Sequence, residues 1–404
     1  MSTKKERRIA DVVIVGGRVA GASLAVRLAS LGLEVLVLER GKIGSDILST
    51  LYIHQPGVEE LRGLGIEMGD TLEGAPAISK MVYEVNDIRI VGKGPWYGKG
   101  NVSYAPRRSR LDRALCIKAE RAGAIILHEA KVTSVNFHGG RACGVTFRRA
   151  DNEYSVRAHL IVGADGMRSL VAEEVGAVSY LERPKLTCCY YGFFRGLERP
   201  FSQYQGHRRW IGVIPTSDSH LVACYVPQDE FTKAKSDPKG TFFSSLQQVS
   251  SSLSQEVAQA QQIGRLIGMG DQQNFFREAS GPGWVLVGDA GHHKDSLTAY
   301  GITEALQQSS FLAEELAKVP IDVPEAVDSA TKMFGTRRDD ESLPRYIPTL
   351  SVARLEVSDA RMTMLRRIQD DPEMCDLYFS AMAGVIPTDD FYKKLSDQGI
   401  LIKK

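Results

Sequence analysis

The feature that most constrains the fold is an apolar segment that runs directly into a glycine-rich turn near the N-terminus. Residues 9–15 are apolar and rich in β-branched side chains, as expected for a strand buried on both faces of a parallel sheet. The turn at residues 16–21 follows at once, and residues 20–30 have the apolar spacing of a helix. A strand, a glycine turn and a helix in this order predict a doubly wound α/β domain.

The same turn predicts a binding site for a pyrophosphate group. A helix N-terminus presents unpaired backbone N–H groups and the positive end of the helix dipole. A second apolar strand at residues 34–38 ends at Glu39, about 20 residues after the turn, where a carboxylate can accept hydrogen bonds from ribose hydroxyls. We therefore expect a dinucleotide to bind to residues of this unit: Gly16, Arg18, Ala20, Gly21, Glu39 and Arg40.

Arg18 departs from the usual Gly-x-Gly-x-x-Gly pattern, because it stands at the second glycine position. That glycine normally lets the backbone approach the pyrophosphate closely. The sequence leaves three outcomes open for Arg18. Its side chain turns outward, it pairs with a phosphate, or it weakens the binding of the nucleotide.

The composition limits the classes of partner. The chain has 404 residues, enough for two domains, with 50 Lys and Arg against 49 Asp and Glu. This balance gives no support for nucleic-acid binding. The sequence has no apolar stretch long enough to cross a bilayer, and its charged residues 1–8 precede a sheet strand rather than a signal-peptide core. We expect a cytoplasmic protein without membrane or nucleic-acid partners; the oligomeric state is open.

The cysteines and histidines give no indication of a metal site. The six cysteines are scattered and form no Cys-x-x-Cys pair, which suits a reducing compartment and argues against a structural zinc. His292 and His293 are adjacent, and we expect them to have structural roles rather than to bind a metal.

The rest of the chain predicts that a second sheet interrupts the nucleotide-binding domain. Residues 187–228 contain aromatic-rich strand segments, residues 231–265 are mostly polar and helical, and residues 337–404 are predominantly helical. We assign three regions: a discontinuous nucleotide-binding domain at residues 1–75, 100–180 and 265–335, a substrate-binding β-sheet domain at residues 76–99 and 181–264, and a C-terminal helical segment at residues 336–404.

Two later segments extend the nucleotide-binding prediction. Residues 163–169 read Gly-Ala-Asp-Gly-Met-Arg-Ser, and residues 284–292 read Trp-Val-Leu-Val-Gly-Asp-Ala-Gly-His. Together with the first turn, and in this order, they resemble the fingerprints of FAD-dependent monooxygenases of the p-hydroxybenzoate hydroxylase type, the group A flavoprotein hydroxylases. The resemblance covers nearly the whole chain. It implies a Rossmann-like FAD-binding domain of the GR2 type with an inserted antiparallel sheet and C-terminal helices.

The resemblance also implies roles for single residues. Asp289, which follows Gly288, would bind the flavin ribityl chain, and Asp165 would touch both FAD and a passing nicotinamide. Arg108 would lie near the FAD. Residues 295–302 match the segment that faces the isoalloxazine ring, where the matching positions are Thr298, Tyr300, Gly301 and Ile302. In this segment Ser296 replaces the usual Pro, which we expect to loosen the loop, and Tyr300 replaces the usual Gln or Gly.

For the reaction, the resemblance implies that NAD(P)H reduces FAD and that O₂ then forms a flavin C4a-hydroperoxide. This species would hydroxylate or epoxidise a planar aromatic or polycyclic, natural-product-like substrate held between the sheet and the flavin. His54 and Arg195 are further catalytic candidates beside Thr298 and Tyr300. Because a strand turns alternate side chains to opposite faces, about half of the candidate lining residues should face the substrate: Tyr191, Phe193, Arg195, Trp210, Val213 and Tyr225.

Three other functions remain open at this point. A flavin-dependent halogenase has a Trp-x-Trp-x-Ile-Pro marker and an essential lysine; residues 210–215 match in part, with Gly212 at the second Trp, and Lys80 is a candidate lysine. A reductase of the geranylgeranyl reductase type would hydrogenate C=C bonds without O₂. A flavin-binding protein without turnover is suggested only by Arg18 and Ser296.

Overall fold

Strand β1 (Lys5–Val15) lies inside an eight-stranded sheet and confirms the first prediction. The computed structural model describes residues 5–42, 44, 49–68 and 74–400. Strand β1 pairs in parallel with β2 (Val35–Glu39) on one side and with β8 (Asn152–Gly163) on the other. Val12, Val13 and Ile14 are fully buried, because helices and loops cover both faces of the sheet. The order of strands is β16-β17-β8-β1-β2-β5, with β7 paired to β8 and β6 to β7. The bounds not yet given are β5 (Ile125–His128), β6 (Ala130–His138), β7 (Arg141–Arg149), β16 (Ser280–Gly281) and β17 (Trp284–Leu286).

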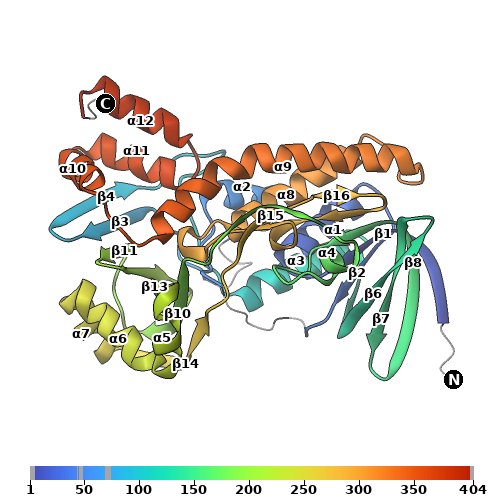
Figure 1. Ribbon diagram of the computed structural model, residues 1–404, viewed down its shortest axis with the longest axis horizontal. Helices are drawn as coiled ribbons and strands as arrows, with labels where there is room; N and C mark the ends of the chain where they lie inside the picture. Colours follow the sequence, from blue (N-terminus) through green and yellow to red (C-terminus); the bar gives the residue numbers. More distant parts are fainter. Residues whose placement is uncertain (1–4, 43, 45–48, 69–73, 401–404) are drawn as a thin grey trace.

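The first sheet is assembled from distant parts of the chain. Strand β17 pairs in parallel with β8, with Trp284 opposite Ile161. Helix α1 (Val19–Ser30), which follows the glycine turn, packs against both α3 (Arg108–Arg121) and α8 (Gly301–Leu316), while α2 (Gln55–Gly63) packs on α8. The nucleotide-binding half on the right of Figure 1 therefore combines early, middle and late segments.

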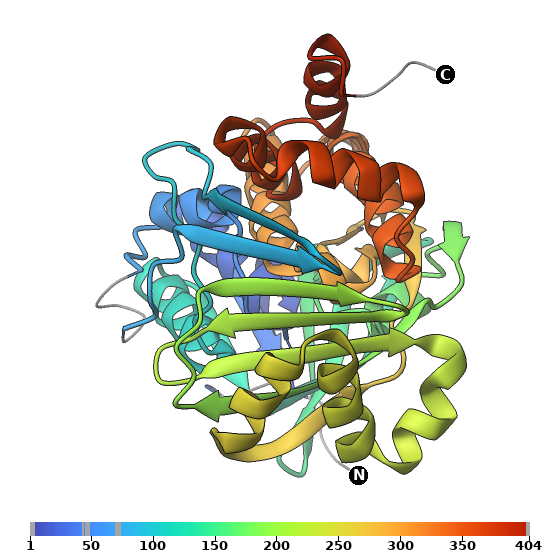
Figure 2. The same cartoon turned by 90° about the vertical axis from the view of Figure 1, so that its left-hand side faces the viewer.

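A seven-stranded sheet forms the second half of the molecule, in the order β14-β10-β13-β12-β11-β3-β4. Neighbouring strands are antiparallel except for β11 and β3, which are parallel. Figure 2 shows this sheet with the C-terminal helices on one side and the α5–α7 helices on the other. The strand bounds are β3 (Lys80–Val85), β4 (Ile88–Lys93), β10 (Thr187–Arg195), β11 (Phe201–Gly206), β12 (Arg209–Pro215), β13 (His220–Pro227) and β14 (Gln261–Met269). The helices are α5 (Phe231–Ser236), α6 (Pro238–Val249) and α7 (Ser251–Gln259).

One sequence-based expectation was wrong for this sheet. We predicted helical structure up to residue 265, but the last helix of this segment ends at Gln259. Strand β14 follows and crosses the expected domain boundary at residue 264. Strand β14 is an edge strand whose side chains are mostly exposed, so no apolar pattern marks it. It is held by backbone pairing to β10, where Tyr191 lies opposite Ile267.

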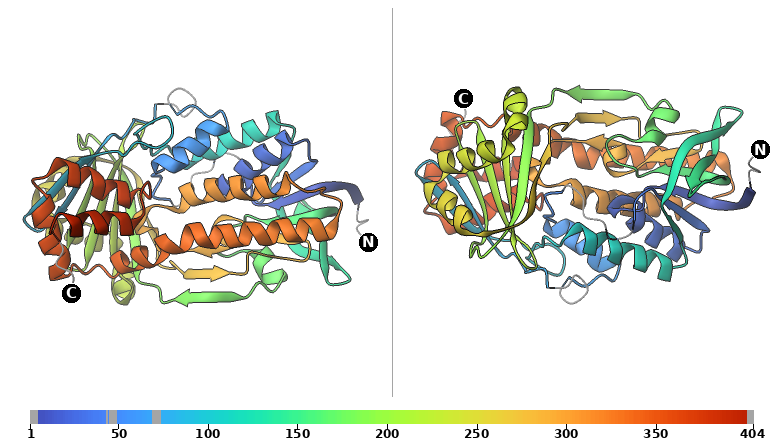
Figure 3. Two further views of the ribbon diagram at one scale, coloured as in Figure 1. Left: turned by 90° about the horizontal axis from the view of Figure 1, so that it is seen from above. Right: turned by 90° about the horizontal axis from the view of Figure 1, so that it is seen from below.

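Helices α8 and α9 (Pro324–Ala353) connect the two halves, and they lie side by side in the view from above (Figure 3). Helix α9 leads to α10 (Asp359–Ile368) and α11 (Pro372–Met382), which cover one face of the second sheet, and to α12 (Thr388–Asp397), which packs on α11. A small sheet of β9 (Ser179–Arg183), β15 (Asn274–Arg277) and β18 (His292–His293) lies between the halves. Across the ranges described, none of the helices combines the length and apolarity that a membrane span requires. The predicted α/β fold class is confirmed.

Candidate functional site

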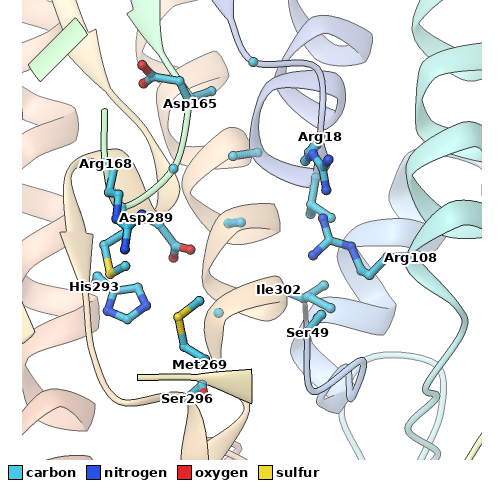
Figure 4. Close-up of a pocket in the computed structure, with 18 of the residues that line it drawn as sticks. Arg18, Ser49, Arg108, Asp165, Arg168, Met269, Asp289, His293, Ser296 and Ile302 are labelled. Carbon is cyan, nitrogen blue, oxygen red and sulfur yellow. The ribbon is translucent and has the colours of Figure 1, made fainter. Parts of the chain in front are cut away.

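A cavity of about 910 Å³ extends from the carboxyl ends of β1 and β2 to the second sheet. At the first end it is lined by Gly16, Arg18 and Glu39, and at the other by Tyr191 and Tyr225. Open parallel sheets usually bind ligands at the carboxyl ends of their strands. The cavity therefore joins the predicted nucleotide site to the predicted substrate sheet, and Figure 4 shows part of its lining.

Two helix N-termini open into this cavity without side-chain caps. Helix α1 begins after Arg18 and α8 after Tyr300, and neither residue caps its helix through a side-chain hydrogen bond. Ala20 in the first turn of α1, and Gly301 and Ile302 in that of α8, line the cavity. Such ends offer free N–H groups and favour negative charge.

The glycine turn needs its glycines for close backbone packing. Gly16 has φ of 103°, in the left-handed region, and a Cβ at Gly21 would lie 1.9 Å from the carbonyl oxygen of Gly16. A side chain at Gly21 would push the first turn of α1 away from the end of β1, and one at Gly16 would clash with the carbonyl oxygen of Ala164, 2.4 Å away, just after β8. The cradle for a phosphate thus depends on both glycines.

Of the three outcomes left open for Arg18, the structure has its side chain turned toward the cavity (Figure 4). Its guanidinium lies on the same side as that of Arg108 in Figure 4. Arg108 is buried and bonds through two nitrogens to the carboxylate of Asp112, at 2.9 to 3.1 Å, whereas Nη1 of Arg18 is buried without a hydrogen-bond partner. Burial lowers the pKa of Arg18, against the opposing pull of Asp112 and Glu39. Arg18 therefore has an unused donor where an anion would fit.

Glu39 lies at the end of β2, as predicted. Its Oε2 accepts a hydrogen bond from the N–H of Gly17 at 2.8 Å, and its Oε1 accepts one from Gly41 at 2.7 Å. These two bonds fix the carboxylate in the cavity wall and leave further lone pairs for a ligand hydroxyl. Arg40 is exposed beside it and also lines the cavity.

Asp289 and Asp165 have different roles in the structure. The side chain of Asp289 is exposed in the cavity, follows Gly288 (φ of 64°), and has no hydrogen-bond partner among the described residues. The carboxylate of Asp165 instead accepts from Ser169 Oγ at 2.5 Å and from the N–H of Leu170 at 2.7 Å. Burial raises the pKa of Asp165, against these bonds. Asp289 is available to a ligand, while Asp165 mainly closes its own loop (Figure 4).

Tyr300 forms part of the cavity wall, and two other predicted catalytic residues support it. The ring of His54 stacks on Tyr300 at 4.5 Å between centroids, and His54 Nε2 donates to the carbonyl oxygen of Thr298 at 3.1 Å. Burial lowers the pKa of His54 to about 4, so the ring is neutral near pH 7. Neither His54 nor Thr298 lines the cavity as described. Their contacts in the structure include the stack of His54 on Tyr300 and the hydrogen bond between His54 and Thr298.

A buried ionic cluster lies beside Tyr300, and sequence reasoning did not find it. The carboxylate of Glu304, in the first turn of α8, pairs with Lys294 and contacts His292 Nε2 at 3.1 Å and Arg345 Nε at 3.2 Å. Although burial alone would raise the pKa of Glu304, Lys294, His292 and Arg345 together hold it well below its ordinary value. The structural role expected for His292 fits this arrangement. Arg345 lies on another helix, so no local pattern could have indicated it.

The second sheet presents only part of the predicted lining. Cross-strand partners on β10 and β13 share the cavity face, with Cys189 opposite Tyr225 and Tyr191 opposite Ala223. The other candidates lie elsewhere. Arg195 is exposed, with Nη2 3.5 Å from Asp218, and the remaining three pack against neighbours: Phe193 under the Arg107 guanidinium, Trp210 against Tyr83, and Val213 in the core beneath α6.

Comparison with known proteins places this site in a family. The family model described as FAD binding domain matches residues 9–329. The chain belongs to this family. The unpartnered Arg18 nitrogen, the two uncapped helices and the free Asp289 carboxylate all fit FAD, whose pyrophosphate and ribityl hydroxyls need such donors and acceptors. Arg18, Glu39 and Asp289 are the side chains that would hold it, and bound FAD would supply the redox chemistry.

Individual relatives carry out different reactions. The chain is 24% identical over 317 residues to a 1H-pyrrole-2-carbonyl-[peptidyl-carrier protein] brominase of Pseudoalteromonas luteoviolacea, which covers 76% of this chain and 77% of the relative. It is 23% identical over 315 residues to a digeranylgeranylglycerophospholipid reductase of Methanocella arvoryzae, covering 76% and 77%. The fold resembles that of the flavin-dependent brominase Bmp2, with a TM-score of 0.82, 18% identity, and coverage of 97% and 99%. The match over residues 9–329 establishes membership of the FAD binding domain family. The assignment to the p-hydroxybenzoate hydroxylase group stays a prediction.

Proposed function

We propose that this protein is an FAD-dependent monooxygenase that uses NAD(P)H and O₂ to oxidise a planar aromatic or polycyclic substrate. The observation that carries the proposal is the composition of the cavity where it meets the second sheet. The wall there is made of Cys189, Tyr191, Leu221, Ala223 and Tyr225. These apolar and aromatic side chains suit a flat, largely apolar molecule, and they exclude water from it.

The residues around this wall match the needs of an oxygenation site. The uncapped N-terminus of α8 opens onto the cavity opposite the sheet, where it stabilises negative charge. Tyr300 is held by His54 on one face, and its hydroxyl donates to the carbonyl oxygen of Met382. The chain thus supplies a rigid, positively polarised surface on one side and an apolar surface on the other.

The arrangement of lysines argues against the halogenase alternative. Lys80 is exposed at the start of β3 and does not line the described cavity. Of the lysines that do line it, Lys294 is ion-paired with Glu304, and Lys131 is exposed on β6 of the nucleotide-binding sheet. An essential lysine would need a free amine at the substrate end, whereas the amine of Lys294 is paired with Glu304.

The experiment that tests the proposal follows the fate of electrons and oxygen. FAD-loaded protein is mixed with NADH or NADPH and a panel of phenols and indoles, and NAD(P)H oxidation, O₂ uptake and product mass are measured, with ¹⁸O₂ in a parallel run. Substrate-stimulated O₂ uptake and one ¹⁸O atom in the product support the monooxygenase. Incorporation of bromide or chloride would identify a halogenase, a gain of two hydrogens without O₂ a reductase, and no reduction of bound FAD a binding protein without turnover.

A further inference from the structure

A chain of hydrogen bonds runs through the cavity wall from the second sheet to the loop before α8. The hydroxyl of Tyr225 lies 3.0 Å from Ser296 Oγ, which lies 2.5 Å from Gln272 Oε1. The other end of the same amide, Gln272 Nε2, lies 2.8 Å from Thr187 Oγ1, and that hydroxyl lies 2.7 Å from Asp295 Oδ2. Tyr225, Thr187, Gln272 and Asp295 are all buried.

The backbone fixes which way the Gln272 amide faces. The N–H of Ser296 lies 3.1 Å from Gln272 Oε1, and a backbone N–H can only donate. On the other side, Gln272 Nε2 lies 3.4 Å from the carbonyl oxygen of Thr187, which can only accept. The amide oxygen therefore faces Ser296 and the NH₂ group faces Thr187.

This orientation sets the direction of every other bond in the chain. The amide oxygen accepts the hydroxyl hydrogen of Ser296, so Ser296 Oγ has only a lone pair to offer Tyr225. Tyr225 must then donate its hydrogen to Ser296. At the far end Thr187 accepts from Gln272 and donates to the carboxylate of Asp295. A proline at position 296 could provide neither the N–H nor the hydroxyl.

Because its hydrogen is committed, Tyr225 presents an oxygen lone pair to the cavity. Besides Ser296, the polar groups among the described residues that act on this phenol are the thiol of Cys189, which is a weak donor, and the carboxylate of Asp295, which has no hydrogen to donate when ionised. Burial raises the pKa of Tyr225 well above its ordinary value, so the phenol keeps its hydrogen. The chain is not a proton relay, because an amide does not readily pass a proton from one end to the other.

Resting on the proposed function, we infer that Tyr225 selects substrates that carry an N–H or O–H group on the aromatic ring, because its oxygen can accept but not donate. A ligand without such a donor would leave the Tyr225 oxygen buried and poorly paired, which costs affinity. Ser296 acts through Tyr225 as a positioning residue. In the family segment that this loop resembles, a proline stands at the position of Ser296. The serine then determines selectivity rather than loosening the loop.

The test measures binding to oxidised, FAD-loaded protein without NAD(P)H, using matched probes that differ in one methyl group. Indole is compared with 1-methylindole, and 2-naphthol with 2-methoxynaphthalene, by titrating the change in the flavin absorption spectrum. We expect each donor to bind about tenfold more tightly than its methylated partner. Equal affinities within both pairs, or no binding of either donor, would overturn the inference without the need for any variant.

Variants then assign the selectivity to the chain of bonds. Tyr225→Phe should bring the donor-to-methyl affinity ratio close to one. Ser296→Ala frees the Tyr225 hydrogen, so isoquinoline, which accepts but cannot donate, should gain affinity several-fold at pH 8. Tyr190→Phe is the matched control, because Tyr190 is the neighbouring buried phenol on β10 but packs in the core away from the cavity. A ratio that survives Tyr225→Phe, or falls equally in Tyr190→Phe, contradicts the inference.

The outcome can be separated from that of the proposed function. Selectivity for donors without O₂-dependent turnover would overturn the monooxygenase proposal and leave the role of Tyr225 standing. Oxygenation of probes that bind with no preference for a donor would overturn the role of Tyr225 and leave the monooxygenase proposal standing.

Discussion

Arg345 on α9 donates from Nε to Oε1 of Glu304 over 3.2 Å and so joins the long C-terminal helix to the first turn of α8. The other carboxylate oxygen of Glu304 is held by Lys294 and by His292. A negative side chain in the first turn also complements the dipole of its helix. Glu304 thus connects α8 to two parts of the chain that come after β17.

Replacing Glu304 with Gln should destabilise the protein by about 3–5 kcal/mol, because Lys294 would remain buried, and Arg345 partly buried, without a counter-charge. Chemical unfolding of the FAD-loaded protein measures this loss. The control is Glu314→Gln on the same helix, where the side chain is half exposed and pairs with Arg337; it should cost no more than about 1 kcal/mol. Equal losses in the two variants would show that burial of the cluster does not matter.

Replacing Arg18 with Ala should weaken FAD binding by roughly 10- to 100-fold, because hydrogen bonds to charged groups contribute about 1.5–3 kcal/mol. Fluorescence titration of the apoprotein with FAD measures the affinity. The remaining affinity should also depend less on salt. The matched control is Arg195→Ala, which removes an exposed arginine near Asp218 and should leave FAD affinity unchanged. An unchanged affinity in Arg18→Ala would contradict the phosphate contact.

The stability of the protein should depend on pH through His54. The unfolded chain binds a proton at this ring near pH 6.5, whereas the folded ring does so only near pH 4. Between these values the unfolded state holds more protons, so stability falls as pH falls from 6.5 to 4. The variant His54→Asn has no such ring. As pH falls from 7 to 4, its free energy of unfolding should therefore rise by roughly 3 kcal/mol relative to that of the wild type.

Urea unfolding at each pH checks this shift, with His207→Asn as the control because His207 is exposed. Asp295 works in the opposite direction over part of the range: burial raises its pKa to about 6, so its contribution to stability grows as pH falls from 6 toward 4. The comparison with the variant cancels this contribution. A stability difference that does not change with pH would mean that the His54 ring is not held neutral.

Replacing Tyr300 with Phe should loosen the C-terminal helices while leaving the stack on His54 in place. The variant loses the hydroxyl that donates to the carbonyl oxygen of Met382 at the end of α11, which we expect to cost about 1–2 kcal/mol. Hydrogen exchange should quicken in α11 and α12 before it does in α1. The control, Tyr392→Phe, alters a half-exposed tyrosine on α12, and it should leave exchange rates unchanged. Uniform quickening across all helices would contradict a local role for Tyr300.

The sequence predicted those parts of the site whose signals are local. Strand β1, the glycine turn and Glu39 lie within one short segment, and their chemistry follows from spacing alone. The strand, the turn and the position of Glu39 are found as expected because backbone geometry within one βαβ unit leaves few alternatives. Asp289 lines the same cavity, and its role toward the flavin stays a prediction.

Features of the site that depend on contacts between residues far apart in the chain could not be predicted from the sequence. Arg345 and Glu304 are 41 residues apart on two helices, and either residue alone looks like an ordinary surface charge. Ser296 was expected to loosen its loop, yet Gln272, 24 residues earlier, binds it twice. Arg195 has the right charge for an acidic substrate, but it lies at the exposed end of its strand. The alternation of side chains along a strand shows which residues share a face of the sheet, but not which face meets the cavity.

The division of the first sheet between early and late segments has a consequence for how the protein is made. The glycine turn and α1 leave the ribosome early, but β17, Asp289 and α8 are synthesised only after the entire second sheet. Until then β8 lacks its neighbour β17, and the apolar face of α1 that packs on α8 is uncovered. The nascent chain therefore carries half a cofactor site through most of its synthesis. The lining of the cavity is complete only once α8 packs on α1, so the site as a whole forms late even though its first residues are made first.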